Sequence, residues 1–66
     1  MNFITETIKE KSDSSAKVTL QTAGYEGEKA SYQVIQNMFG DSEVYTYRTL
    51  KGAEKKYHYL TASIEG

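Results

Sequence analysis

The chain has 66 residues, with eight Lys or Arg against nine Asp or Glu and no cysteine. A chain of this length forms a single domain, 1–66, with a thin core. The absence of cysteine excludes disulfides, thiolate catalysis and cysteine-ligated zinc or iron–sulfur clusters. A formal net charge of −1 gives no general attraction to nucleic acid. Because no apolar run is long, we expect a cytoplasmic protein with no membrane segment.

The N-terminal third predicts a β-hairpin. Residues 16–23 alternate apolar and polar side chains, which places Ala16, Val18 and Leu20 on one face of a strand. Residues 3–10 favour a strand through their isoleucine and threonine content, although a short helix also fits their spacing. The SDSS sequence at 12–15 is typical of a turn. We therefore expect two strands joined at 12–15.

Residues 28–39 have helical spacing. Four residues recur at intervals of three and four: Ser31, Val34, Ile35 and Met38. A strand would place Gln36 on the face of Val34 and Met38, which disfavours that alternative. Gly40 suits the position that follows a helix. The pattern predicts a short helix here.

Residues 43–50 and 56–64 are rich in tyrosine and threonine, and they flank Gly52 in the KGAE sequence at 51–54. This composition predicts a C-terminal β-hairpin. The expected fold is therefore α+β, in the β-grasp-like order β-β-α-β-β, with one helix packed on one antiparallel or mixed sheet. The alternative is a five-stranded all-β meander or small barrel with residues 30–39 extended. The expected core comprises Val18, Leu20, Val34, Ile35, Met38, Leu60 and Ile64.

The residues needed for most catalytic chemistry are scarce. His58 is the only histidine, and nothing in the spacing places a nucleophile and an orienting carboxylate beside it. Asp41 and Glu43 lie two apart in a predicted turn but lack the calcium-loop pattern. Gly24 and Gly27 lack the spacing of a phosphate-binding loop. We therefore expect no enzymatic activity, no metal and no cofactor.

Tyrosine is the most informative residue type. Four of the six tyrosines fall in the predicted C-terminal hairpin: Tyr45, Tyr47, Tyr57 and Tyr59. A turn of three or five residues places all four on one outer face, whereas two or four residues would pair Tyr45 and Tyr47 with His58 and Leu60. Cross-strand aromatic pairs would stabilise the hairpin, and an exposed aromatic face would also suit binding.

The expected function is that of a small protein-binding module, an inhibitor or adaptor, with a protein partner and a possible homodimer. The alternative is a domain that binds single-stranded nucleic acid. It would stack bases on the tyrosines and contact phosphates through nearby cations: Arg48, Lys51, Lys55 and Lys56. The acidic stretch at 26–43 counts against this alternative.

Overall fold

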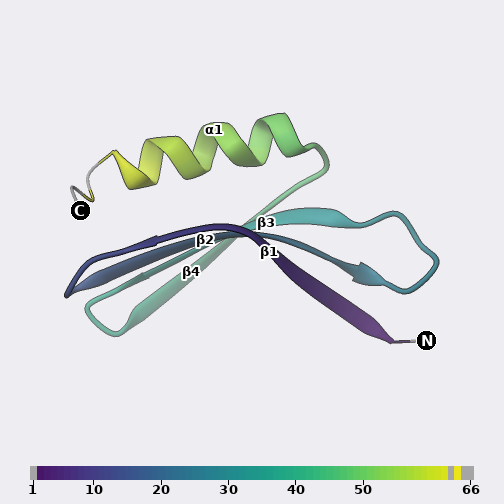
Figure 1. The fold of residues 1–66 in the computed structure, drawn as a ribbon, viewed down its shortest axis with the longest axis horizontal. Helices are drawn as coiled ribbons and strands as arrows, with labels where there is room; N and C mark the ends of the chain where they lie inside the picture. The colour runs from purple at the N-terminus through teal and green to yellow at the C-terminus, as the bar shows by residue number, and fades with distance from the viewer. Residues whose placement is uncertain (1, 63, 65–66) are drawn as a thin grey trace.

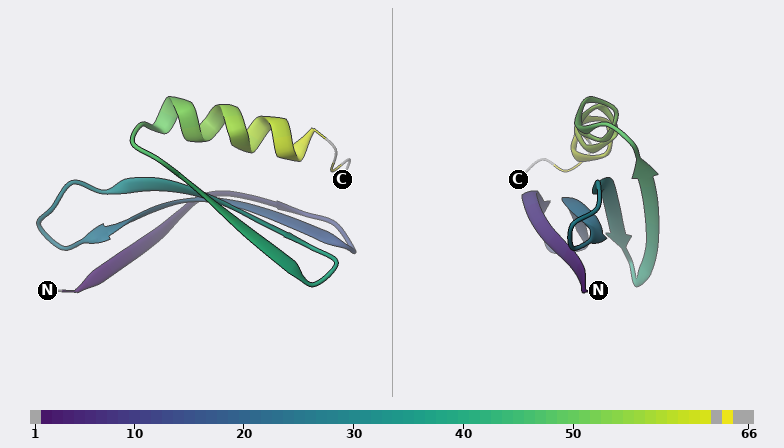
Figure 2. Two further views of the ribbon diagram at one scale, coloured as in Figure 1. Left: turned by 180° about the vertical axis from the view of Figure 1, so that it is seen from behind. Right: turned by 90° about the vertical axis from the view of Figure 1, so that its right-hand side faces the viewer.

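The computed structural model describes residues 2–62 and 64. Four strands precede one helix: β1 (Phe3–Ser12), β2 (Ala16–Tyr25), β3 (Ser31–Met38), β4 (Asp41–Tyr47) and α1 (Leu50–Thr61). The strands form one antiparallel meander in the order β1-β2-β3-β4. The helix packs on β2, β3 and β4 across one face (Figure 1). The opposite face carries no covering element within the described part of the chain (Figure 2).

The α+β class and the single helix on one face of a sheet are confirmed. The element order is wrong, because the chain runs β-β-β-β-α rather than in the β-grasp-like order. The five-stranded alternative is also wrong as a whole, since the C-terminal segment is a helix. Two of its features are correct, namely the meander connection of the strands and the extended conformation of residues 31–38.

The N-terminal hairpin is confirmed. Strands β1 and β2 pair antiparallel from Phe3 opposite Tyr25 to Ser12 opposite Lys17. The register shifts between Thr7 and Lys9, which marks a β-bulge in β1. The predicted turn at 12–15 joins the two strands.

The predicted helix over 28–39 is wrong, because most of this segment forms β3. Its alternate residues pack toward α1, with Val34 buried and with Tyr32 and Met38 partly buried against the core. Gln36 does share that face. It is only half-buried, in the rim of a shallow hollow with Met38 and Glu43, so its amide is not removed from water. Sheet pairing on both sides therefore outweighs the helical spacing.

The predicted C-terminal hairpin is also wrong, because residues 50–61 form α1 and Gly52 lies within its first turn. Its first strand, predicted over 43–50, is confirmed over residues 43–47, which belong to β4. Three residues of α1 at intervals of four and three are buried, namely Ala53, Tyr57 and Leu60, and Ile64 is buried beyond the end of the helix. Thr49 caps the helix by accepting a hydrogen bond from the Gly52 backbone N–H at 3.2 Å. The apolar stripe and the cap specify a helix despite the tyrosine and threonine content.

The core lies between α1 and the face of the sheet beneath it. It contains Ala16, Val18, Leu20, Val34, Ala53, Tyr57, Leu60 and Ile64. Five predicted core residues are thus confirmed, and Met38 packs against them while partly exposed. The prediction for Ile35 is wrong, because it alternates with Val34 onto the uncovered face. There it lies between Thr19 of β2 and Val44 of β4.

Candidate functional site

The four predicted site tyrosines do not form one exposed face. Tyr45 and Tyr47 of β4 are half-buried on the side of the sheet that α1 covers, and Tyr57 is buried in α1 against the core. Only Tyr59 is freely accessible, at 73% exposure. The hairpin that would have aligned the four rings is absent, since Tyr57 and Tyr59 belong to a helix.

A cation–aromatic cluster joins α1 to β4. The Lys56 amine lies 4.3 Å from the centroid of the Tyr45 ring and 5.3 Å from that of Tyr59. The Tyr45 hydroxyl donates a hydrogen bond to the Glu43 carboxylate. That bond is the main cause of a raised pKa at Tyr45, because the carboxylate disfavours the phenolate. This cluster fixes the outer strand to the helix.

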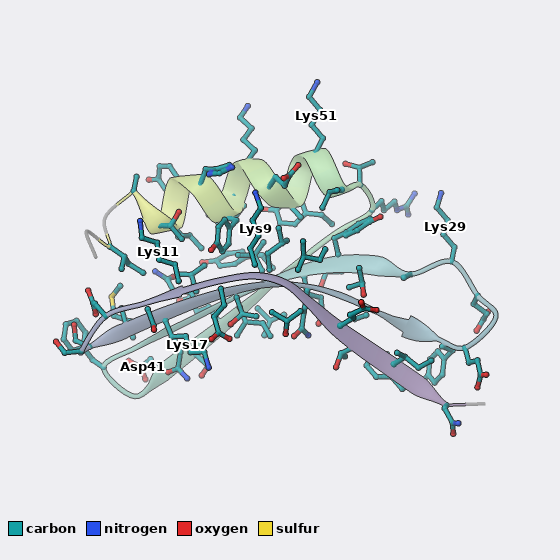
Figure 3. The ribbon with its side chains drawn as sticks, viewed as in Figure 1. Lys9, Lys11, Lys17, Lys29, Asp41 and Lys51 are labelled. Carbon is teal, nitrogen blue, oxygen red and sulfur yellow. The ribbon has the colours of Figure 1, made fainter. Side chains whose placement is uncertain are left out.

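Three of the four cations of the predicted nucleic-acid site, Lys51, Lys55 and Lys56, belong to α1, and Arg48 precedes the helix by two residues. Figure 3 shows Lys51 pointing from α1 away from the sheet, with Lys9 reaching toward the helix from β1. The Lys9 amine lies 3.4 Å from the Glu54 carboxylate of α1. Of the predicted stacking residues, only Tyr59 offers an exposed ring beside these cations.

Two turns meet at one end of the sheet and form what we call the turn platform, residues 12–16 and 38–41. The Asp13 carboxylate accepts hydrogen bonds from the backbone N–H groups of Ser15 and Ala16, both at 2.8 Å. These bonds lower the pKa of Asp13, because they stabilise its charged form. The Phe39 N–H donates to the Ser15 carbonyl at 3.2 Å, which ties the two turns together.

Phe39 is the most exposed large apolar side chain in the described residues, at 79%. It forms the β3–β4 turn with Gly40, between the paired residues Met38 and Asp41. Both turn residues have positive φ angles, 50° for Phe39 and 87° for Gly40. Such turns favour Asn, Asp or Gly at both positions, so phenylalanine is unfavourable there.

A shallow hollow of about 590 Å³ lies beside Phe39, lined by residues 12–17, Asn37 and Gly40. Its lining residues include Ser12, Ser14 and Ser15 of the Ser/Asp turn. The sequence prediction missed this site because residues 39–40 were assigned to the end of a helix. A two-residue turn ending in glycine between two strands was the pattern that could have revealed it.

The remaining chemical candidates are dispersed. His58 is exposed on α1 and makes an edge contact with the Tyr57 ring, with centroids 5.8 Å apart. Asp41 and Glu43 lie exposed on β4, two residues apart. Over residues 2–62 and 64, no three His, Asp or Glu side chains gather where they could hold a metal ion. None of the described helices has the length and apolar character needed to cross a bilayer.

Comparison with protein-family models, with curated proteins and with solved structures finds no match for this chain. Its geometry therefore carries the functional argument. Within that geometry, the turn platform combines an exposed aromatic ring, a strained backbone and a rigid polar surround.

Proposed function

We propose that this chain is a small protein-binding module, an inhibitor or adaptor, that inserts Phe39 of the turn platform into an apolar pocket of its partner. The observation that carries the proposal is the conformation of Phe39. An aromatic ring that is 79% exposed stands on a residue with φ of 50°. Buried aromatic anchors of this kind dominate the binding energy of many protein interfaces.

Phe39 costs the fold more free energy than its ring recovers within the chain. A left-handed conformation costs an L-residue other than glycine about 1–2 kcal/mol. The exposed ring recovers little of this, because it buries only a small part of its surface in its own chain. Asparagine or glycine would avoid the cost in the same turn. The benefit of phenylalanine therefore lies in a contact outside the chain.

The surroundings of Phe39 also suit a protein partner. The bond from its N–H to Ser15 and the bonds to Asp13 hold both turns in one shape, so little entropy is lost when a partner docks. Three serines line the hollow beside Phe39, and polar residues of this kind suit the rim of an interface. The charged side chains of the turn platform are Asp13 and Asp41, and the neighbouring Lys17 pairs with Glu10 at 3.4 Å, so the platform has no surplus of positive charge for a polyanion.

The test is affinity capture from a lysate of the source organism with three purified forms: wild type, Phe39→Asn and Tyr59→Ala. We expect one captured protein to be lost with Phe39→Asn and retained with Tyr59→Ala, since Tyr59 lies on α1, outside the platform. Calorimetry with that purified protein should then show at least a tenfold loss of affinity for Phe39→Asn. Equal affinity of Phe39→Asn and wild type would refute the proposal.

The competing nucleic-acid function predicts a different pattern. A single-stranded oligonucleotide would contact the cations of α1 and stack on Tyr59, so its affinity would fall with Tyr59→Ala and with added salt. Phe39→Asn would leave that affinity unchanged. Titration of the same three forms with an oligonucleotide at low and high salt separates the two functions.

A further inference from the structure

The sheet has two edges, and they differ in how they are protected. An edge strand presents unpaired backbone N–H and C=O groups that can pair with another chain. At one edge, β1 carries the bulge between Thr7 and Lys9 and adds a second lysine at Lys11. Bulges and lysines are the usual means of blocking edge pairing. The β1 edge is therefore unsuited to strand addition.

The other edge has neither form of protection. Strand β4, Asp41–Tyr47, pairs with β3 in seven successive pairs with no shift of register. It contains no lysine and no proline. In the right-hand view of Figure 2, no element of the described chain lies beyond its outer side. Val44, at the centre of the strand, is 55% exposed.

We propose that β4 pairs antiparallel with β4 of a second copy of this chain, about a two-fold axis that runs perpendicular to the sheet between the two Val44 residues. The two sheets then form one continuous sheet, with both helices on the same side. This inference goes beyond the proposed function and does not depend on it, because the turn platform is not part of the pairing.

The charges of β4 favour a second copy as the occupant of this edge. The first half of the strand is acidic, with Asp41 and Glu43, and Arg48 follows its last residue. Antiparallel pairing about Val44 places Glu43 opposite Tyr45 of the second copy, whose ring lies beside the Lys56 amine. The same pairing brings Asp41 to the end of the strand where Arg48 lies. Each copy therefore sets its acidic half against cations of the other.

The apolar side chains favour the same register. On the uncovered face, Val44 lies beside Ile35 of β3. Pairing about Val44 joins these residues from both copies into one apolar row, with the two valines in direct contact. Pairing centred at Ser42 or Glu43 would place carboxylates opposite one another, which is unfavourable.

Cysteine cross-linking tests both the edge and the register, because the native chain has no cysteine. Directly opposed residues in an antiparallel pair lie about 4.5–5.5 Å apart, within the range of a disulfide. Mild oxidation should therefore link Val44→Cys into a covalent dimer. Ile4→Cys, 49% exposed on β1, is the matched control and should link only at the rate of random collision. Glu43→Cys should link poorly, because position 43 faces position 45 of the second copy. The two introduced cysteines are therefore not directly opposite one another.

Light scattering after gel filtration tests the same interface without cross-linking. The wild-type mass should rise with concentration toward twice the 7.5 kDa of the single chain. Val44→Lys should remain monomeric at concentrations where wild type and Ile4→Lys are dimeric. Phe39→Asn should dimerise like wild type. The experiments therefore distinguish failure of the proposed partner binding from failure of the proposed dimer.

Two outcomes would overturn the inference. One is a wild-type chain that stays monomeric up to about 1 mM while Val44→Cys links no faster than Ile4→Cys. The other is a dimer that Ile4→Lys dissociates and Val44→Lys does not, which would place the contact at β1. Circular dichroism of each variant confirms that it is folded before its mass is interpreted.

Discussion

Phe39→Asn should stabilise the isolated domain. The substitution removes most of the cost of a left-handed residue, about 1–2 kcal/mol for phenylalanine, because asparagine adopts this conformation readily. Against this, the ring is 79% exposed. About a fifth of the ~1.5–3 kcal/mol available from full burial is therefore lost, about 0.3–0.6 kcal/mol. The expected net gain is about 0.5–1 kcal/mol, which raises the Tm of so small a domain by about 2–8 °C.

Thermal and urea unfolding followed by far-UV circular dichroism measure this gain. Phe39→Ala is the matched control, since it removes the same ring but keeps a side chain that is unfavourable at φ of 50°. We expect Phe39→Ala to be no more stable than wild type. A Phe39→Asn variant that unfolds below wild type would show that the ring is worth more to folding than its exposure indicates. The benefit of the ring would then lie in folding and not in a partner.

Three further predictions concern the sheet and its turns. Leu20→Ala, in the core at 0% exposure, should cost about 2–5 kcal/mol in urea unfolding, and Ile35→Ala on the uncovered face should cost clearly less. The pKa of Asp13 is lower in the folded chain than in the unfolded chain, so Asp13 stabilises the fold above its unfolded pKa, and this stability is lost as the pH falls below about 4. Asp13→Asn should therefore reduce the fall of the urea midpoint with decreasing pH. Gly24→Ala should destabilise the fold by about 1–3 kcal/mol, because the added Cβ would lie 2.9 Å from the Ala30 Cα.

The N-terminal half of the sheet was predictable because local pattern and tertiary packing agree there. Ala16, Val18 and Leu20 alternate with polar residues, and the same three side chains meet the helix. The turn at 12–15 has its own chemistry, since the Asp13 carboxylate can bond the backbone ahead of it in any context. Such segments carry the information for their structure within a few residues.

The sequence predictions for α1 and β3 were wrong for a common reason. Both segments have a mixture of spacings, so local pattern left the choice open. Ile35 next to Val34 looks like one helical face but lies on two faces of a sheet. In α1, tyrosine and threonine favour a strand, while Ala53, Tyr57 and Leu60 have helical spacing. The choice depends on which segment finds a partner strand, and that is a property of the whole chain.

The two proposed surfaces have a geometric relation that limits how they can work together. Phe39 precedes Val44 by five residues, and pairing about Val44 places the second Phe39 the same distance beyond the axis in the opposite direction. Because Phe39 lies in the turn, only the three steps of strand from Val44 to Asp41 count on each side of the axis, so at 3.3 Å per residue the two turns lie about 20 Å apart. They also stand at opposite ends of the paired strands. A dimer would therefore engage two partner molecules, or two separate sites on a large one, rather than close both rings on one pocket. The expected complex contains two copies of this chain and two partner molecules. Its measured mass distinguishes it from a complex of two copies with a single partner molecule.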